Sequence, residues 1–266
     1  MNYGFIGAGN MAGAIIKGMT VGTGSFEGKD IFVYDLNASA AKSLADICKV
    51  NVCSSAEDVI ASSDVLVLAV KPNVLPDVVT QLKNKIIEKS PLVISIAAGK
   101  TLEFLLGLIA KYFPIVRVMP NINAKVGCAT SAFCTTETVS DEQKAIVKKL
   151  FSTVGAVTEL SEKMFSIHSV IGGAAPAFAY LYIDALSRAA VKAGMPKKQA
   201  LELTAQTVLG SAKMVLESGE HPWELIDQVC SPGGTTIEGV CSLEANGFET
   251  ALCKAFDAVY EKDKRL

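Results

Sequence analysis

The residues near the start of the chain that could do chemistry form a glycine-rich turn. Gly7, Gly9 and Ala12 give the pattern G-x-G-x-x-A after the apolar run 3–6, and a helix is expected over 11–19. The first glycine permits a sharp strand-to-helix turn, and the second lets a pyrophosphate approach the backbone. Free N–H groups at the helix N-terminus then face the phosphates. The pattern predicts a dinucleotide site. The alternative is a glycine turn that binds no nucleotide.

An acidic residue follows at the distance expected of a ribose-binding carboxylate. Asp35 ends the apolar run 31–34, about 20 residues past the glycines. A carboxylate there accepts a hydrogen bond from a ribose 2′-OH and repels a 2′-phosphate. Because no arginine stands at residues 36–40, the residues favour NADH, with NADPH as the alternative. Asp35 could instead cap the helix that follows.

A second glycine-rich stretch lies far along the chain, in the loop Ser231–Thr236. Two adjacent glycines are flanked by three hydroxyls just before a helix, which gives a cradle of N–H and O–H donors for an anion such as a substrate carboxylate. The alternative is a plain helix N-terminus capped by Thr235 or Thr236.

Four further side chains carry or can carry charge. Lys71 follows a strand on the ligand side of the expected sheet and could hold a cofactor or a carboxylate, or could be a solvated loop lysine. Arg117 lies inside a strand and is expected to form a structural ion pair. His168 and His221 are candidates for acid–base groups, although we favour structural roles for both. No metal site is expected, because the histidines and cysteines do not cluster.

Apolar runs alternate with helix-like segments over the first part of the chain. Strands are expected at residues 3–6, 31–34, 50–52, 64–70, 92–96, 115–119, 130–135 and 156–160. Helices are expected between them, at residues 11–19, 38–47, 56–61, 76–89, 102–110 and 140–152. This alternation predicts an α/β fold, a Rossmann-type, doubly wound parallel sheet whose ligands bind beyond the carboxyl ends of the strands.

The strand signal vanishes from Met164 onward. Helices are expected at residues 174–193, 197–217, 223–229, 237–245 and 248–264. The chain is therefore expected to hold an NAD(P)-binding domain over 1–160 and an all-α domain over 161–266. Because helix 174–193 is apolar on more than one face, we expect the second domain to form at least a homodimer.

Composition excludes several classes of protein. The net charge is −2 with acids and bases interspersed, so no nucleic-acid surface is expected. The apolar stretch 174–183 is interrupted by Asp184, Arg188 and Lys192, which is short of a membrane span. Seven scattered cysteines without a C-x-x-C pair suit reduced thiols, and no signal peptide precedes the first strand, so a cytoplasmic location is expected.

Five motifs together make the chain resemble the pyrroline-5-carboxylate reductases, which catalyse the last step of proline synthesis. In order they are F-I-G-A-G-N-M-A (5–12), L-A-V-K-P (68–72), S-I-A-A-G-K-T (95–101), R-V-M-P-N (117–121) and V-C-S-P-G-G-T-T-I (229–237). Their order and spacing make the resemblance specific, and it runs from end to end.

The resemblance implies a reaction and a set of site residues. Hydride passes from NADPH or NADH to the C=N bond of L-1-pyrroline-5-carboxylate, and the ring nitrogen takes a proton. The loop binds the substrate carboxylate, and Thr236 lies near the ring nitrogen as a donor. The expected substrate-binding residues are Ser231, Gly233, Gly234, Thr235 and Thr236. The expected cofactor-binding residues are Gly7, Ala8, Gly9, Asn10, Met11, Asp35, Ala69, Val70, Lys71, Pro72 and Ala97. The family's dimers often assemble further into decamers.

Two stretches depart from the family's usual pattern. Ile122-Asn123 replaces Thr-Pro after Met-Pro-Asn, and Gly172-Gly173-Ala174-Ala175 replaces Ser-Gly-Ser-Gly before Pro176. Hydroxyls are thereby lost near the expected substrate side. Two alternatives stay open, a reductase of the same build acting on another imino or oxo acid, and a non-catalytic protein that senses NAD(P).

Overall fold

The computed structural model describes residues 1–22 and 26–265, which divide into two compact units, 1–173 and 174–265. Residues 23–25 and 266, which fall inside the two domains expected from the sequence, lie outside the described residues.

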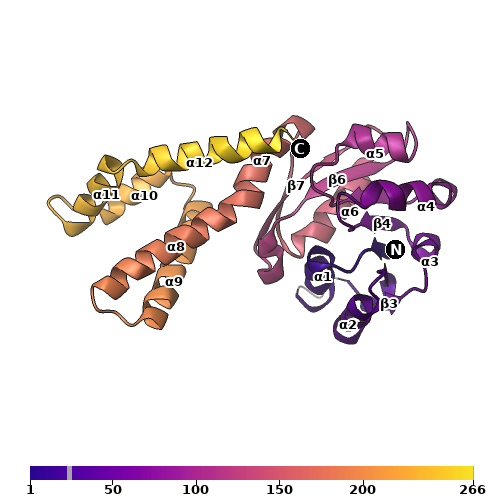
Figure 1. The fold of residues 1–266 in the computed structure, drawn as a ribbon, viewed down its shortest axis with the longest axis horizontal. Coiled ribbons are helices and arrows are strands. Elements are labelled where there is room, and N and C mark those ends of the chain that lie inside the picture. The colour runs from indigo at the N-terminus through magenta and orange to yellow at the C-terminus, as the bar shows by residue number, and fades with distance from the viewer. Residues whose placement is uncertain (23–25, 266) are drawn as a thin grey trace. The chain divides into compact units, whose positions relative to one another are not determined.

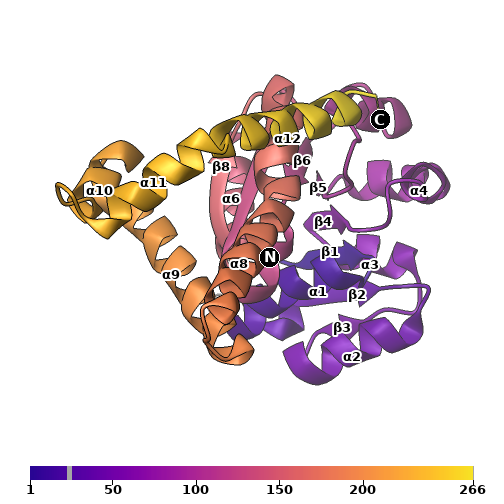
Figure 2. The same ribbon diagram turned by 60° about the vertical axis from the view of Figure 1, so that its left-hand side comes forward.

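The described part of the first unit is built on one eight-stranded sheet (Figure 1). Its strand order is β3-β2-β1-β4-β5-β6-β7-β8, most of which is labelled in Figure 2. Neighbouring strands run parallel, apart from β7, which runs antiparallel to β6. The order reverses between β1 and β4, which confirms the doubly wound fold. The strands are β1 (Tyr3–Ile6), β2 (Ile31–Tyr34), β3 (Asn51–Val52), β4 (Val65–Leu68), β5 (Leu92–Ser95), β6 (Ile115–Met119), β7 (Ala129–Thr135) and β8 (Gly155–Glu159).

The reversal at β7 corrects the expectation of a wholly parallel sheet. Only residues 120–128 join β6 to β7, and they contain a short 3-10 turn, Ile122–Val126. A parallel pair needs a crossover of about a dozen or more residues, usually with a helix. The connection is too short for one, so β7 returns beside β6, and its first residues lie at the carboxyl end of β6.

Six helices of the first unit cover the two faces of the sheet. One apolar cluster includes residues from α1 (Asn10–Lys17), α2 (Ala38–Cys48) and α6 (Asp141–Ser152). These residues are Ile15, Leu44 and Phe151, respectively. Ile60 and Val79 bring α3 (Ala56–Ser62) and α4 (Leu75–Lys89) onto a second cluster, with α5 (Leu102–Leu108). A sheet covered on both faces explains why its strands are continuously apolar.

Helix starts follow the local sequence closely. Asn37 accepts a hydrogen bond from the Ser39 N–H at the start of α2. Ser140 and Gln143 form a capping box at the start of α6. Helix α1 ends at Lys17 and continues as a π-helical turn, Gly18–Gly22, rather than as α-helix to Met19.

Short helical pieces end the first unit. A 3-10 turn, Glu162–Met164, leads into α7 (Phe165–His168) and then into a π-helical turn, Ser169–Ala174. Residues up to Gly173 belong with the first unit, beyond the boundary near residue 160 that the sequence favours.

The described part of the second unit is wholly helical, as expected. It contains α8 (Ala175–Lys192), α9 (Lys197–Ser218), α10 (Pro222–Val229), α11 (Thr235–Ala245) and α12 (Phe248–Asp263). Helices α8 and α9 form a hairpin that can be followed in Figure 2. At the start of α10, His221 Nδ1 accepts a hydrogen bond from the Trp223 N–H, which gives this histidine a structural role.

Long apolar side chains stand exposed on α8 and α9, including Leu181 and Leu209. The continuous helical stretch 162–192 is long and apolar enough, by length and composition alone, to cross a membrane. It is longer than the apolar segment expected from the sequence, because residues 165–173 continue the helical path without a charged side chain. Little of it is buried within the single chain, so this surface needs an apolar cover.

Candidate functional site

The glycine-rich turn has the geometry that its sequence predicts. Gly7 has φ +108°, and a Cβ on it would lie 2.7 Å from the carbonyl oxygen of Ala69, so only glycine fits between β1 and the end of β4. A Cβ on Gly9 would meet nothing within 4 Å. Gly9 is the N-cap of α1 and makes no side-chain cap hydrogen bond. The first turn of α1 therefore offers its N–H groups to an anion.

Asp35 fastens the glycine turn to the end of β2. Its Oδ2 accepts a hydrogen bond of 2.6 Å from the Ala8 N–H, and its Oδ1 accepts one of 2.8 Å from the Asn37 N–H. Asn37, rather than Asp35, caps α2, so the interpretation of Asp35 as a helix cap is wrong. The carboxylate still faces the cavity beside the turn, where it places a negative charge.

A cavity of about 570 Å³ lies beside this turn at the carboxyl edge of β1, β2 and β4. Its lining combines residues of the turn, the acidic residues Asp35 and Glu57, apolar residues and Gln81 of α4, and Lys71. Of the residues expected to bind cofactor, it brings together Gly7, Gly9, Asp35, Ala69, Val70 and Lys71. A space of this size and composition suits a nucleoside and its phosphates.

The other expected cofactor residues lie elsewhere. Ala8 and Asn10 line a second cavity, which α1, α2 and the turn Ile122–Val126 border and which Gly9 also lines. Met11 packs against the apolar cluster of that face. Pro72 is partly exposed after β4, and Ala97 is buried after β5 among apolar side chains. Lys71 is exposed.

The glycine and hydroxyl loop of the second unit ends as a bare helix N-terminus. Gly234 is the N-cap of α11 and makes no side-chain cap hydrogen bond, so the alternative of a Thr235 or Thr236 cap is wrong. The Gly234 N–H donates to the carbonyl oxygen of Ser231 at 2.9 Å. A Cβ on Gly234 would lie 2.5 Å from Ser231 Oγ, and Gly233 has φ +69°, so both glycines are needed for this turn. Hydroxyls and free N–H groups gather there, as an anion site requires.

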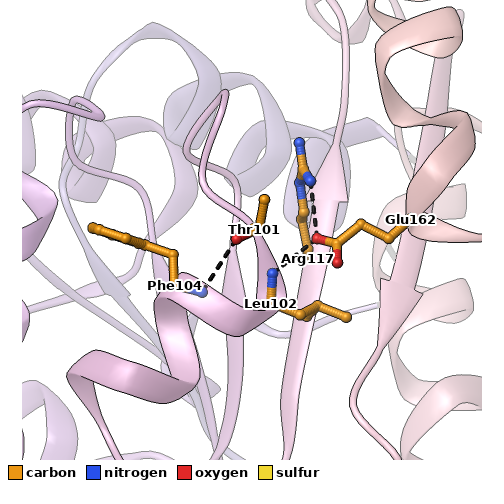
Figure 3. A network of polar contacts seen from close by, with 5 residues as sticks. All are labelled: Thr101, Leu102, Phe104, Arg117 and Glu162. Carbon is orange, nitrogen blue, oxygen red and sulfur yellow. Dashed lines mark hydrogen bonds and ion pairs between the residues drawn. The ribbon is translucent and has the colours of Figure 1, made fainter. Parts of the chain in front are cut away.

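Arg117 takes the structural role expected from its place inside β6. Its Nη1 lies 2.9 Å from Glu162 Oε1, which also accepts a hydrogen bond of 2.8 Å from the Leu102 N–H (Figure 3). The guanidinium lies over the Phe165 ring at 4.4 Å. Glu162 thus joins β6 to the start of α5, and it pairs with the charge of Arg117. Thr101 caps the same helix through the Phe104 N–H.

Sequence reasoning did not find the hydrogen bonds that hold the loop after β6. Asn121 is buried, donates from Nδ2 to the carbonyl oxygen of Gly172 and accepts the Thr130 N–H at Oδ1. His168 Nε2 lies 3.1 Å from the carbonyl oxygen of Met119. The sequence shows only an asparagine after a strand and a histidine in an apolar stretch. Neither feature indicates which distant residue is the hydrogen-bond partner.

Comparison with known proteins places the chain in a family. Residues 162–266 match the family model described as pyrroline-5-carboxylate reductase dimerisation, and residues 2–99 match that of coenzyme F420-dependent NADP oxidoreductases. The pyrroline-5-carboxylate reductase of Escherichia coli is 40% identical over 265 residues, which cover 99% of this chain and 97% of that protein. The chain belongs to the pyrroline-5-carboxylate reductase family. Like that family, it is an NAD(P)H-dependent oxidoreductase.

Solved structures of pyrroline-5-carboxylate reductases agree with this assignment. The enzyme of Coxiella burnetii superposes with a TM-score of 0.94 at 33% identity, covering 99% of this chain and 97% of that one. The Plasmodium falciparum enzyme, solved with NADP bound, gives 0.86 at 32% identity, covering 100% and 97%. The dimerisation region of the pyrroline-5-carboxylate reductase family includes the exposed helices α8 and α9, so the chain forms a homo-oligomer through its helical region.

Proposed function

We propose that the chain reduces L-1-pyrroline-5-carboxylate to L-proline. The reduced nicotinamide gives a hydride to C5 of the C=N bond, and the ring nitrogen, which receives the electron pair of that bond, takes one proton. The observation that carries the proposal is the full-length likeness to pyrroline-5-carboxylate reductases, together with a bare N-terminus of α11 in the loop where the family pattern is intact.

Within the first unit we assign the dinucleotide to the cavity beside the glycine turn. The residues fit such a group, because the open space over Gly9 and the uncapped start of α1 suit a pyrophosphate. The dinucleotide supplies the hydride, and the protein's part is to bind and orient it. Asp35 accepts the 2′-OH of a ribose and opposes a 2′-phosphate, so we propose a preference for NADH.

Within the second unit we assign the substrate carboxylate to residues 231–236. The N–H groups at the start of α11 and the hydroxyls of Ser231 and Thr235 can hold its two oxygens. We assign Thr236 to the ring nitrogen, where its hydroxyl donates a hydrogen bond and passes a proton from water.

We further propose a cytoplasmic protein whose dimers assemble into decamers. All seven cysteines are described and unpaired, as a reducing compartment requires. The exposed apolar side chains of α8 and α9 provide the surface for pairing.

The test is reduction of pyrroline-5-carboxylate followed at 340 nm, with NADH and NADPH in parallel. We expect turnover with both, and a higher kcat/KM with NADH. Linear 2-oxo acids with the same reduced dinucleotides, and 3-hydroxy acids with NAD⁺ or NADP⁺ as the hydride acceptor, serve as controls and should fail. Turnover of one of these alone would make the chain a reductase of another acid. Dinucleotide binding without turnover of any of them would make it a sensor.

A further inference from the structure

A buried histidine lies at the carboxyl end of β6, and the reaction as proposed makes no use of it. His168 is 9% exposed and comes from α7, while Met119 is the last residue of β6. Their contact of 3.1 Å joins His168 Nε2 to the Met119 carbonyl oxygen, 49 residues away in the sequence. A carbonyl oxygen only accepts hydrogen bonds, so Nε2 carries the proton and donates.

Burial favours the neutral form of the imidazole in this position. Burial lowers the pKa of His168 from its ordinary value, and the hydrogen bond to Met119 opposes that shift only in part. A neutral ring with its proton on Nε2 keeps a fixed tautomer and a fixed orientation. The contact with Met119 is therefore maintained at neutral pH.

Gly172 leaves the space that the imidazole fills. A Cβ on Gly172 would lie 2.9 Å from both Cε1 and Nε2 of His168, closer than real Cβ contacts. The family's usual pattern has serine at this position, whereas glycine at 172 in this chain leaves room for the imidazole ring. His168 and Gly172 thus depend on each other.

The same turn is tied to the strand end a second time. The Gly172 carbonyl oxygen accepts a hydrogen bond of 2.9 Å from Asn121 Nδ2. Met119 and Pro120 are partly exposed, whereas Asn121 and His168 are buried. The two hydrogen bonds therefore tie residues 119–121 to α7 and the π-helical turn, while Met119 and Pro120 keep part of their surface accessible.

This backbone lies where the nicotinamide half of a dinucleotide belongs. In a doubly wound sheet the dinucleotide crosses the point where the strand order reverses, here between β1 and β4. Asp35, at the end of β2, is assigned to the ribose of one half of the dinucleotide, which therefore lies over β2. The other half then extends over the carboxyl ends of β4, β5 and β6, and the last of these ends at Met119.

We propose that His168 is a positioning residue for hydride transfer, which holds the backbone of Met119–Asn121 against the nicotinamide through the space left by Gly172. The inference rests on the proposed function, because it assumes that hydride transfer is the step this backbone serves. A loop that supports one face of a ring sets the distance and angle of transfer, and small displacements there slow the chemical step.

The first test compares His168→Leu with His168→Gln. Leucine removes the donor at similar volume, and glutamine keeps an N–H that can reach the Met119 carbonyl oxygen. We expect His168→Leu to lower kcat about 10-fold, with the KM for the dinucleotide within about twofold. Dinucleotide deuterated at the transferred position should show a larger kinetic isotope effect in this variant. His168→Gln should recover most of kcat and restore the isotope effect.

Val170→Ala is the matched control, because Val170 is buried in the same π-helical turn but makes no side-chain hydrogen bond. It should lower the unfolding temperature and leave kcat and the isotope effect unchanged. If Val170→Ala and His168→Leu change the isotope effect equally, the role of His168 is general packing and the inference is wrong.

The second test works from the glycine side. Gly172→Ala should displace the imidazole and lower kcat in the natural chain, but should have little effect in a His168→Ala background, where the space is free. Additive effects would contradict the inference.

Wild-type protein that binds NADH without reducing pyrroline-5-carboxylate would overturn the proposed function instead. Normal wild-type turnover with an unchanged isotope effect in His168→Leu would overturn the role of His168 alone.

Discussion

Two single residues carry most of the proposed chemistry, and they do so in different ways. Thr236 is exposed at the first turn of α11, where its hydroxyl has no capping duty. Asp35 is held by two backbone N–H groups, so its orientation is fixed before any ligand arrives. A free hydroxyl suits proton exchange, and a fixed carboxylate suits discrimination between ligands.

Replacing Thr236 by alanine should lower kcat by roughly 10- to 1,000-fold, the range for loss of one positioned donor. The measurement is steady-state reduction of pyrroline-5-carboxylate, with thermal unfolding alongside. Ser242→Ala is the control, because it removes an exposed hydroxyl from the same helix. An unchanged kcat in Thr236→Ala would remove this residue from the mechanism.

Replacing Asp35 by serine should shift preference toward NADPH, because the charge that opposes a 2′-phosphate is gone. We expect the ratio of kcat/KM for NADPH to that for NADH to rise about tenfold, equivalent to ~1.4 kcal/mol. Asp35→Asn keeps an oxygen acceptor for the Ala8 N–H and separates charge from loop anchoring. A ratio that does not move would leave Asp35 with the anchoring role only.

Among the elements, β6, α5 and the turn at Glu162 are joined through one shared carboxylate. The Glu162 carboxylate accepts from both Arg117 and the Leu102 N–H in a partly buried position (Figure 3). Removing one member of such a pair leaves a buried guanidinium without its counter-ion.

Glu162→Ala should therefore lower the free energy of unfolding by about 3 kcal/mol. Urea denaturation followed by circular dichroism measures this change. Glu159→Ala is the matched control, because Glu159 pairs with Lys144 and Lys148 at the surface, where such a change is worth about 1 kcal/mol or less. Equal losses for the two variants would show that burial of Arg117 has no consequence.

The features that depend on neighbouring residues could be predicted from the sequence. The features that depend on contacts between distant residues could not. The turn at Gly7, the caps at Asn37 and Ser140 and the need for a partner at Arg117 follow from a few neighbouring residues. The direction of β7 depends on the length of its connection. The pairing of His168 with Met119 and Gly172 is visible only once β6 and the π-helical turn are side by side. Local sequence patterns do not predict contacts between residues that are far apart in the sequence.

On the scale of the whole molecule, the described second unit has little core of its own. Of the residues of α10, α11 and α12, none is buried in the single chain. A helix that is apolar around its circumference needs cover from elsewhere. The family's dimerisation region coincides with these helices, so a second copy supplies that cover.

Leu181→Arg should disrupt this pairing, because it puts a charge into a surface that dimerisation buries. Light scattering at micromolar concentration should show an oligomer for the natural chain and a smaller species for the variant. Ile47→Arg is the control, since Ile47 is an exposed apolar residue of the first unit. A monomeric natural chain would refute the oligomer, and an unchanged mass in Leu181→Arg would place the interface elsewhere.

The separation of the dinucleotide cavity from the pairing helices has a genetic consequence. A subunit damaged at Gly7 or Asp35 keeps the helices α8 to α12, and so it still enters assemblies with intact subunits. A damaged subunit that lacks these helices stays outside them. In cells that also carry a normal copy, alleles of the first kind should form mixed assemblies in proportion to their expression. Early truncations should form none.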